Sequence, residues 1–179
     1  MSKYVAFLRA INVGGHVVKM DALRGLFEGL KFSNVETFIA SGNVIFDTKA
    51  MPDQRLELKI EKHLESELGY GVAAFVRSID EIRAISVYQP FSKEAVESAH
   101  VVNVGFIRES LTPTALELAM AFGTDVDDFH FQGREVYWLT RIPQNESKFP
   151  AKKFEKVLGG AATWRNTNTI ARIAAKYGP

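Results

Sequence analysis

The 179-residue chain contains no cysteine. It therefore has no disulfide framework, no thiolate nucleophile and no cysteine-based metal site. No apolar run approaches the roughly 18 residues that span a bilayer, so no membrane-spanning segment and no membrane partner are predicted. The chain passes from Met1 into a strand-like pattern without the apolar core of a signal peptide. These absences predict a cytoplasmic protein.

The chain also lacks a strong net charge. Its formal charge is +1, and 46% hydrophobic with 24% charged residues is typical of a globular protein. The charge is unevenly distributed, because residues 141–179 carry a balance of +6 and leave the first 140 residues at −5. Two interpretations remain for this basic third: a surface for anions, or solvated lysines near helix ends.

Residues 4–47 contain the segment around which the chain is organised: a strand, a glycine loop, a helix, and two strands joined by a tight turn. Ser78 is placed to cap the third helix, with Glu81 in the capping-box position. The predicted elements of the first half are strand 4–11, helix 21–30, strands 35–40 and 44–47, helix 53–68, strand 72–77 and a helix from residue 78.

The second half repeats this order after a connector that ends near His100. Phe106-Ile107-Arg108 matches Phe7-Leu8-Arg9, and each half has a glycine in its hairpin turn. The predicted elements are strand 101–107, helix 112–122, hairpin strands 128–131 and 135–140, helix 150–158, strand 161–165 and helix 168–176. This order predicts an α+β fold of two tandem ferredoxin-like (βαββαβ) subdomains, residues 1–92 and 98–179, that arose by internal duplication.

The first strand of each half is apolar on both faces. In the first half Tyr4, Ala6 and Leu8 alternate with Val5 and Phe7. A sheet with two apolar faces needs cover on both. We therefore expect the two subdomains to pack into one compact unit, although a homodimer would supply the same cover.

Three blocks of sequence carry a resemblance to a known family. They read LRAINVGGH at residues 8–16, VETFIASGNVIF at 35–46 and TWRNTNT at 163–169. In this order they resemble a mostly bacterial family known as a domain of unknown function, DUF1697. The resemblance implies two tandem ferredoxin-like subdomains, and it brings no activity, substrate or cofactor. The chain departs from the family at Ala10, where relatives have glycine, at Ala40, where they have glutamine, and at Thr167, where they have an aromatic residue, while Trp164 precedes the arginine here.

The loop from Asn12 to His16 lies between a strand and a helix and contains Gly14 and Gly15. Backbone N–H groups in such a loop can hold an anion, but two glycines also let a chain turn tightly. The loop matches neither the Walker pattern nor the dinucleotide fingerprint, so it predicts no nucleotide cofactor.

Two further segments are more polar than their turns require. Ser41-Gly42-Asn43 is typical of a hairpin turn, and the segment Arg165–Asn168 is typical of a helix cap. An arginine beside amides and hydroxyls also suits phosphate or carboxylate. We therefore hypothesise that one polar cleft between the subdomains binds a small anionic ligand through Arg9, Asn12, Gly14, Gly15, Ser41, Asn43, Arg165, Asn166 and Asn168.

Catalytic patterns are sparse. The four histidines show no metal-binding spacing, and no metal site is predicted; His63 is expected to be solvated and His130 structural. Tyr137 and Trp138 point to opposite faces of a strand that lacks the basic–aromatic pattern of RNA-binding sheets, which places a nucleic-acid partner below a small ligand. Binding of a small anionic or phosphorylated ligand is the favoured function; a metal-independent enzyme using the same cleft and a nucleic-acid module using the basic third are the alternatives.

Overall fold

The computed structural model describes residues 1–39 and 42–178. Over these residues the chain forms two compact units, the first made of Met1–Ser86 with Ala171–Pro179 and the second of Val87–Ile170. Each unit contains one four-stranded antiparallel sheet, and seven α-helices occur in the described part of the chain. None of these helices is both long and apolar enough to cross a bilayer.

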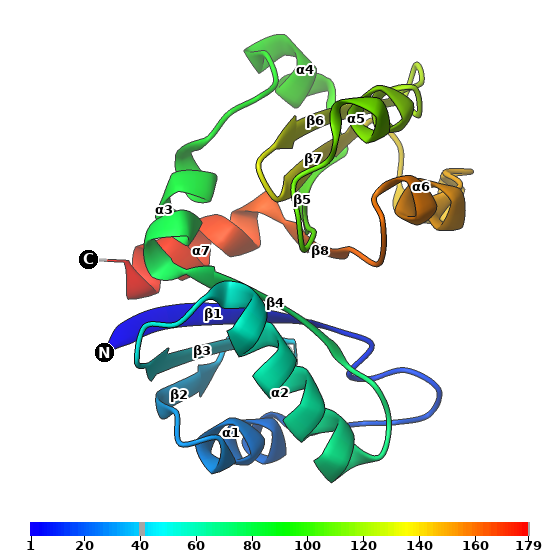
Figure 1. Ribbon diagram of the computed structural model, residues 1–179. Coiled ribbons are helices and arrows are strands. Elements are labelled where there is room, and N and C mark those ends of the chain that lie inside the picture. The colour runs from blue at the N-terminus through cyan, green and yellow to red at the C-terminus, as the bar shows by residue number, and fades with distance from the viewer. Residues whose placement is uncertain (40–41, 179) are drawn as a thin grey trace. The chain divides into compact units, whose positions relative to one another are not determined.

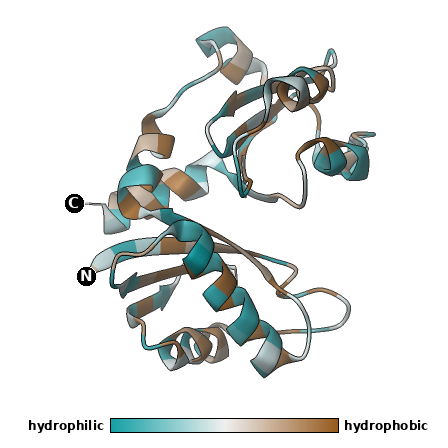
Figure 2. Ribbon diagram, in the orientation of Figure 1, coloured by the Kyte–Doolittle hydropathy of each residue, from teal (hydrophilic) through white to brown (hydrophobic). Residues whose placement is uncertain are grey.

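The first sheet has the strand order β2-β3-β1-β4, with β1 between β3 and β4 (Figure 1). Its elements are β1 (Ser2–Arg9), α1 (Met20–Gly29), β2 (Ser33–Thr37), β3 (Asn43–Thr48), α2 (Asp53–Leu68), β4 (Ala73–Ser78) and α3 (Ile79–Val87). Brown and teal segments alternate along α2 in Figure 2, as expected for an amphipathic helix. Leu23 and Phe27 of α1 and Leu56 of α2 join Tyr4 and Phe46 in one buried cluster, so both helices cover the same face.

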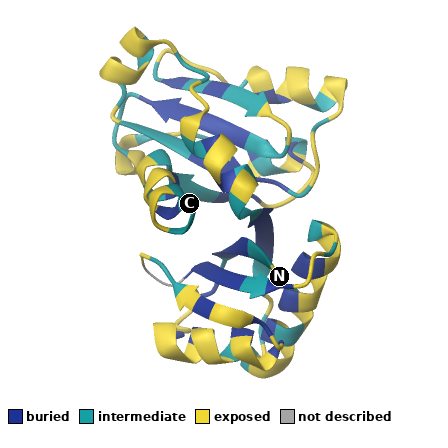
Figure 3. Cartoon of the chain, turned by 90° about the vertical axis from the view of Figure 1, so that its left-hand side faces the viewer, coloured by how far each residue is buried: buried dark blue, intermediate teal, exposed yellow. Residues whose placement is uncertain are grey.

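The second sheet has the equivalent order, β6-β7-β5-β8. The elements of this part of the chain are α4 (Lys93–Ser98), β5 (Val101–Phe106), α5 (Pro113–Met120), β6 (Asp127–Gln132), β7 (Glu135–Thr140), the 3-10 helix η1 (Gln144–Glu146), α6 (Ala151–Val157), β8 (Thr163–Asn166) and α7 (Thr167–Tyr177). Ala119 of α5 and Phe154 of α6 pack with Phe129, Val136 and Trp138 of the sheet. The strands are largely buried, while the helices expose their outer surfaces (Figure 3).

Both faces of each central strand are buried, as the apolar pattern predicts. In β1, Val5 and Phe7 are as inaccessible as Ala6 and Leu8, which point the other way. In β5, Val104 and Phe106 are fully buried on one face, and Gly105 is buried on the other. The packing of the two subdomains into one compact unit stays a prediction.

Two carboxylates of α2 cap the outer edge of β4. Glu61 accepts a hydrogen bond from the N–H of Ala74 at 2.9 Å, and Glu57 accepts one from the N–H of Val76 at 2.8 Å. Residues one helical turn apart on α2 therefore match alternate N–H groups of an edge strand. An edge strand with its N–H groups occupied is protected from pairing with another chain.

Several predicted elements are confirmed. Helix 53–68 is observed with the same bounds, and the predicted capping box is present, since Glu81 accepts from the N–H of Ser78 at 2.7 Å and Ser78 Oγ accepts from the N–H of Glu81 at 3.3 Å. The hairpin about Gly133 is present too. The first strand ends at Arg9 rather than residue 11, because Ala10 has a left-handed φ of 66°. The predicted connector contains the short helix α4, which buries no residue and so leaves no apolar pattern.

Candidate functional site

The loop after β1 is closed by its own hydrogen bonds. Asn12 Oδ1 accepts from the N–H of Val18 at 2.8 Å. Gly14 and Gly15 have φ values of 62° and 83°, so both positions require the left-handed backbone that glycine adopts without strain. The loop is also fixed from outside, because Tyr70 Oη donates to the carbonyl of Ile11 at 2.7 Å. These contacts agree with the tight-turn interpretation of the loop.

Asn43 has a comparable local role at the turn before β3. Its Nδ2 donates to the carbonyls of Phe38 and Ile39 at 2.9 and 3.0 Å, and the residue is only 4% exposed. The side chain therefore holds the turn backbone in place. Asn43 pairs with Phe7 of β1, two residues before Arg9, so the strand pairing brings Arg9 and Asn43 to the same end of the sheet. Ser41 lies outside the described residues.

The predicted residues of the second unit lie together where β8 becomes α7. Arg165 Nη1 donates to the carbonyl of Trp164 at 2.8 Å and to Thr163 Oγ1 at 2.9 Å, and burial lowers the pKa of its guanidinium to about 10. Asn166 Oδ1 accepts from the N–H of Asn168 at 2.8 Å, which is the capping interaction of the alternative interpretation. Whether this group and the first-unit residues share one site stays a prediction.

An equivalent arginine occupies the same place in the first sheet. Arg77 Nη1 donates to the carbonyl of the preceding residue, Val76, at 2.8 Å, and Arg77 pairs with Val5 of β1 as Arg165 pairs with Val104 of β5. Arg77 is fully buried, with Glu57 3.9 Å from its Nη1. Two arginines with the same register and the same backbone contact indicate that the fold itself uses an arginine at this position.

Sequence reasoning missed an open cavity of about 470 Å³ in the second unit. It lies between the β5–α5 connection and the end of α6, and we call it the Arg108 cavity. Its polar lining consists of Arg108, Glu109, Ser110 and Thr112. Arg108 lies just after β5 and matches Arg9, the last residue of β1, in the sequence repeat, and that match was the available sequence signal.

The opposite wall of the Arg108 cavity includes two residues without side chains. Gly159 and Gly160 follow α6 with φ values of 79° and 157°, and a Cβ on either would meet no atom within 4 Å. Their N–H groups donate to carbonyls of α6, at 3.2 and 3.1 Å. The same glycines line an adjoining open hollow of about 550 Å³ that also contains Lys152 and Lys156. Both hollows that share the glycine pair therefore have cationic side chains in their lining.

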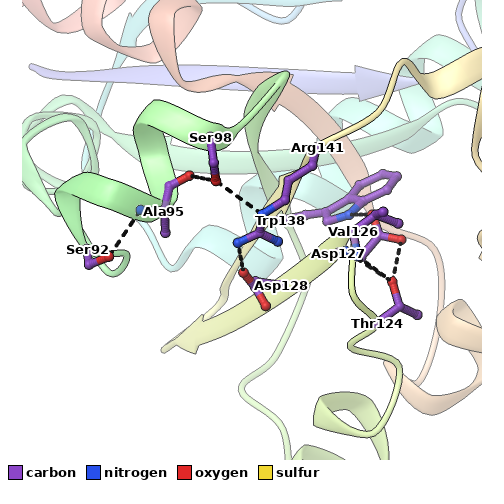
Figure 4. A network of polar contacts seen from close by, with 9 residues as sticks. All are labelled: Ser92, Ala95, Ser98, Thr124, Val126, Asp127, Asp128, Trp138 and Arg141. Atoms are coloured by element: carbon purple, nitrogen blue, oxygen red, sulfur yellow. Dashed lines mark hydrogen bonds and ion pairs between the residues drawn. The ribbon is translucent and has the colours of Figure 1, made fainter.

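The acidic segment 125–128 is occupied by internal contacts (Figure 4). Asp127 accepts from the indole Nε1 of Trp138 at 2.8 Å, and Asp128 forms an ion pair with Arg141, also at 2.8 Å. Arg141 Nε donates to Ser98 Oγ at 3.1 Å, which ties α4 to the sheet. This arrangement is that of a structural acidic turn.

The histidines have separate local environments. His16 stacks on Tyr70 with ring centroids 4.0 Å apart, and His130 Nε2 lies 2.8 Å from Tyr88 Oη. His63 differs from the expectation of solvation, because its Nε2 is buried without a hydrogen-bond partner among the described residues. Within the same residues no three His, Asp or Glu side chains gather as metal ligands.

The aromatic residues of β7 are not available for base stacking in this structure. Tyr137 is 2% exposed and Trp138 6% exposed. Tyr137 packs against Tyr88, with ring centroids 5.3 Å apart, and burial raises the pKa of its hydroxyl. The sheet surface that an RNA-binding domain would present is therefore buried here.

The architecture is that of an α+β protein with two four-stranded antiparallel sheets. The chain belongs to the DUF1697 family of proteins of unknown function, whose family model matches residues 1–137. The fold is similar to that of the conserved bacterial protein SP0830 from Streptococcus pneumoniae, with a TM-score of 0.72, 22% sequence identity, and coverage of 98% of this chain and 97% of that one. No curated protein matches the chain significantly.

Proposed function

We propose that this protein binds a small anionic ligand, a phosphate or carboxylate compound, in the Arg108 cavity. The observation that carries the proposal is the cavity itself, whose volume of about 470 Å³ falls within the range of small-molecule sites. Arg108 supplies a planar guanidinium suited to bidentate contact with phosphate or carboxylate. Ser110 adds a hydroxyl beside it.

The surrounding charge supports an anion. Lys152 and Lys156 line the hollow on the other side of Gly159 and Gly160. The nearby carboxylate of Glu155 is directed at the backbone, where it accepts from the N–H of Ala162 at 3.4 Å. Three cationic side chains therefore line the two hollows that share the glycine pair.

The alternative binding site consists of the residues that were predicted from the sequence. Arg9, Asn12, Gly14, Gly15 and Asn43 would hold the anion in the first unit, with the Arg165–Asn168 turn completing a cleft. Local bonds of Asn12, Asn43 and Arg165 account for part of the polarity of these residues. The Arg108 cavity is favoured because its lining residues enclose a measurable volume. The two locations make different predictions in solution.

The test is a titration of the ¹⁵N-labelled protein with inorganic phosphate, followed by amide chemical shifts. The proposal expects saturable shifts at Ser110, Gly159 and Gly160, and their loss in Arg108→Gln. Arg24→Gln, the same charge change on an exposed part of α1, is the matched control and should bind normally. Shifts confined to Gly14 and Gly15 would instead place the anion in the first unit.

A thermal-shift screen of sugar phosphates, nucleotides and carboxylates then identifies the ligand class. A ligand at 100 times its dissociation constant adds about 2.7 kcal/mol of stability, or roughly 5–10 °C for a chain of this length. Turnover of a stabilising compound, lost in Arg108→Gln, would favour a metal-independent enzyme. Steeply salt-dependent binding of oligonucleotides would favour the nucleic-acid module. Absence of any saturable effect would refute anion binding.

We further infer that each unit is ferredoxin-like. Support comes from the βαββαβ order of elements and from the strand orders β2-β3-β1-β4 and β6-β7-β5-β8, in which the first and third strands of each unit lie side by side at the centre. Origin by duplication, cytoplasmic location and homodimer formation stay predictions.

A further inference from the structure

The Arg108 cavity has an apolar wall that an anion alone does not use. Ile107 and Leu158 belong to the buried core of the second unit, and Leu111 and Val157 pack against that core. All four also line the cavity. The wall is therefore a continuation of the hydrophobic core that is accessible from the opening.

Small residues leave this wall uncovered. Ala115, in the first turn of α5, lines the cavity together with the glycine pair that follows α6. A larger side chain at residue 115 would therefore take up part of the cavity volume. The cavity thus combines a charged end at Arg108 with an apolar recess a few residues away along the same connection.

We propose that the ligand is an amphiphile with one anionic group: a single phosphate or carboxylate head carried on an apolar body about the size of an aromatic ring. The inference rests on the proposed function and adds the part of the ligand that the apolar wall selects. The head lies at Arg108 and the body lies against Leu111 and Val157. Glu109 lines the same opening and disfavours a second anionic group elsewhere on the ligand.

The chemistry follows from the two kinds of surface. An apolar group that leaves water for this recess gains affinity in proportion to the area buried, while the charged head fixes the orientation. A fully hydrated anion gains nothing from the recess. A neutral apolar compound lacks the contact with Arg108. The ligand that uses both surfaces is bound more tightly than either part alone.

The experiment compares inorganic phosphate, phenyl phosphate and benzyl alcohol by amide chemical-shift titration of the full chain. Phenyl phosphate should bind at least about tenfold more tightly than inorganic phosphate, and it should cause additional amide chemical-shift changes at Leu111 and Val157. Benzyl alcohol should bind more weakly than phenyl phosphate. In Leu111→Asn the advantage of phenyl phosphate should disappear while phosphate binding is retained.

Leu116→Asn is the control, since Leu116 is an exposed leucine of α5 that does not line the cavity, and it should leave both affinities unchanged. Ala115→Met tests the recess without adding polarity, because it fills the space and should weaken phenyl phosphate only. Equal affinities for phosphate and phenyl phosphate would overturn the amphiphile while leaving anion binding intact. No cavity shifts with either phosphate compound would overturn the proposed function as well.

Discussion

Replacing Gly105 with alanine should destabilise the second unit through one specific contact. Gly105 lies in β5 opposite Trp164 of β8. A Cβ at residue 105 would stand 2.7, 2.8 and 2.9 Å from three atoms of the Trp164 ring. Real Cβ atoms do not approach carbon so closely, so the indole has to move.

The indole has little space to move. Trp164 contacts Trp138 edge-on with ring centroids 5.5 Å apart, and Phe154 with centroids 6.4 Å apart. Overpacking in such a cluster costs about 1–3 kcal/mol. Alanine also lowers the conformational entropy of the unfolded chain, which offsets about 0.4–1 kcal/mol of this cost. Gly105→Ala should therefore lower the free energy of unfolding by roughly 1–2 kcal/mol, or Tm by about 2–8 °C.

The assay is urea unfolding followed by far-ultraviolet circular dichroism. Tryptophan fluorescence is unsuitable, because the chain has two tryptophans, Trp138 and Trp164, and a companion variant, Trp164→Leu, lacks one of them. Gly25→Ala is the matched control: Gly25 is exposed on α1, and a Cβ there meets no atom within 4 Å. Because alanine is the better helix former, this variant should gain about 0.5–1 kcal/mol.

A double-mutant cycle separates the clash from general effects of alanine. Trp164→Leu removes the ring and is destabilising by itself, but in its presence Gly105→Ala should cost little. The two changes should therefore couple by about 1–2 kcal/mol. Strict additivity, or a Gly105→Ala protein as stable as the parent, would refute the reasoning.

Three further substitutions test contacts in the first unit. Ala10→Gly should raise stability by up to about 1 kcal/mol in urea unfolding, because φ is 66° and glycine adopts this backbone without strain; a loss would contradict this. Glu57→Ala should cost about 3–5 kcal/mol, since it leaves the N–H of Val76 and a buried arginine without their carboxylate, whereas Glu57→Gln should cost less because it keeps an acceptor oxygen. Hydrogen bonding to Lys176 holds the pKa of Glu36 below its usual 4.5, so its contribution to stability is present above that pH and is lost as the pH falls below it. Glu36→Gln should therefore flatten the dependence of Tm on pH in the acid range; an unchanged slope would argue against the interaction.

Much of the fold is encoded in local signals that a single sequence displays. The apolar stripe of α2 has Pro52 before it and Gly69 after it, and its predicted bounds agree with the structure. The capping box of Ser78 and Glu81 is equally local. The order of strands and helices could be predicted from such signals in both halves, because each element has its own hydrophobic periodicity and its own start and stop residues.

The errors at strand ends have a different cause. β1 stops at Arg9 because Ala10 is left-handed, and β2 stops at Thr37 shortly before Ile39, whose φ is 45°. Alanine and isoleucine give no sign of such a backbone, since both are rare there. Only the glycine that relatives carry at the position of Ala10 hinted at the first of these turns.

The candidate site could be predicted only in part. The sequence singled out Asn12 and Asn43 as more polar than their turns require, but a sequence does not distinguish an amide that binds a ligand from one that binds its own loop. The Arg108 cavity was missed because its lining comes from residues 107–115 and 157–161, about fifty positions apart. These segments meet because β5 pairs with β8, and a pairing partner is not a local property of the chain.

The internal repeat identifies two arginines that serve the fold. Arg77 and Arg165 occupy equivalent strands, pair with equivalent residues and donate to the preceding carbonyl at the same distance of 2.8 Å. A contact that recurs in both sheets, whatever surrounds it, is a requirement of the architecture. Arg108 lies two residues after β5 and lines a cavity. If one arginine of the second unit binds a ligand, its loss should abolish binding, and Arg108 is a better candidate than Arg165 because Arg165 has the backbone contact that recurs in both sheets.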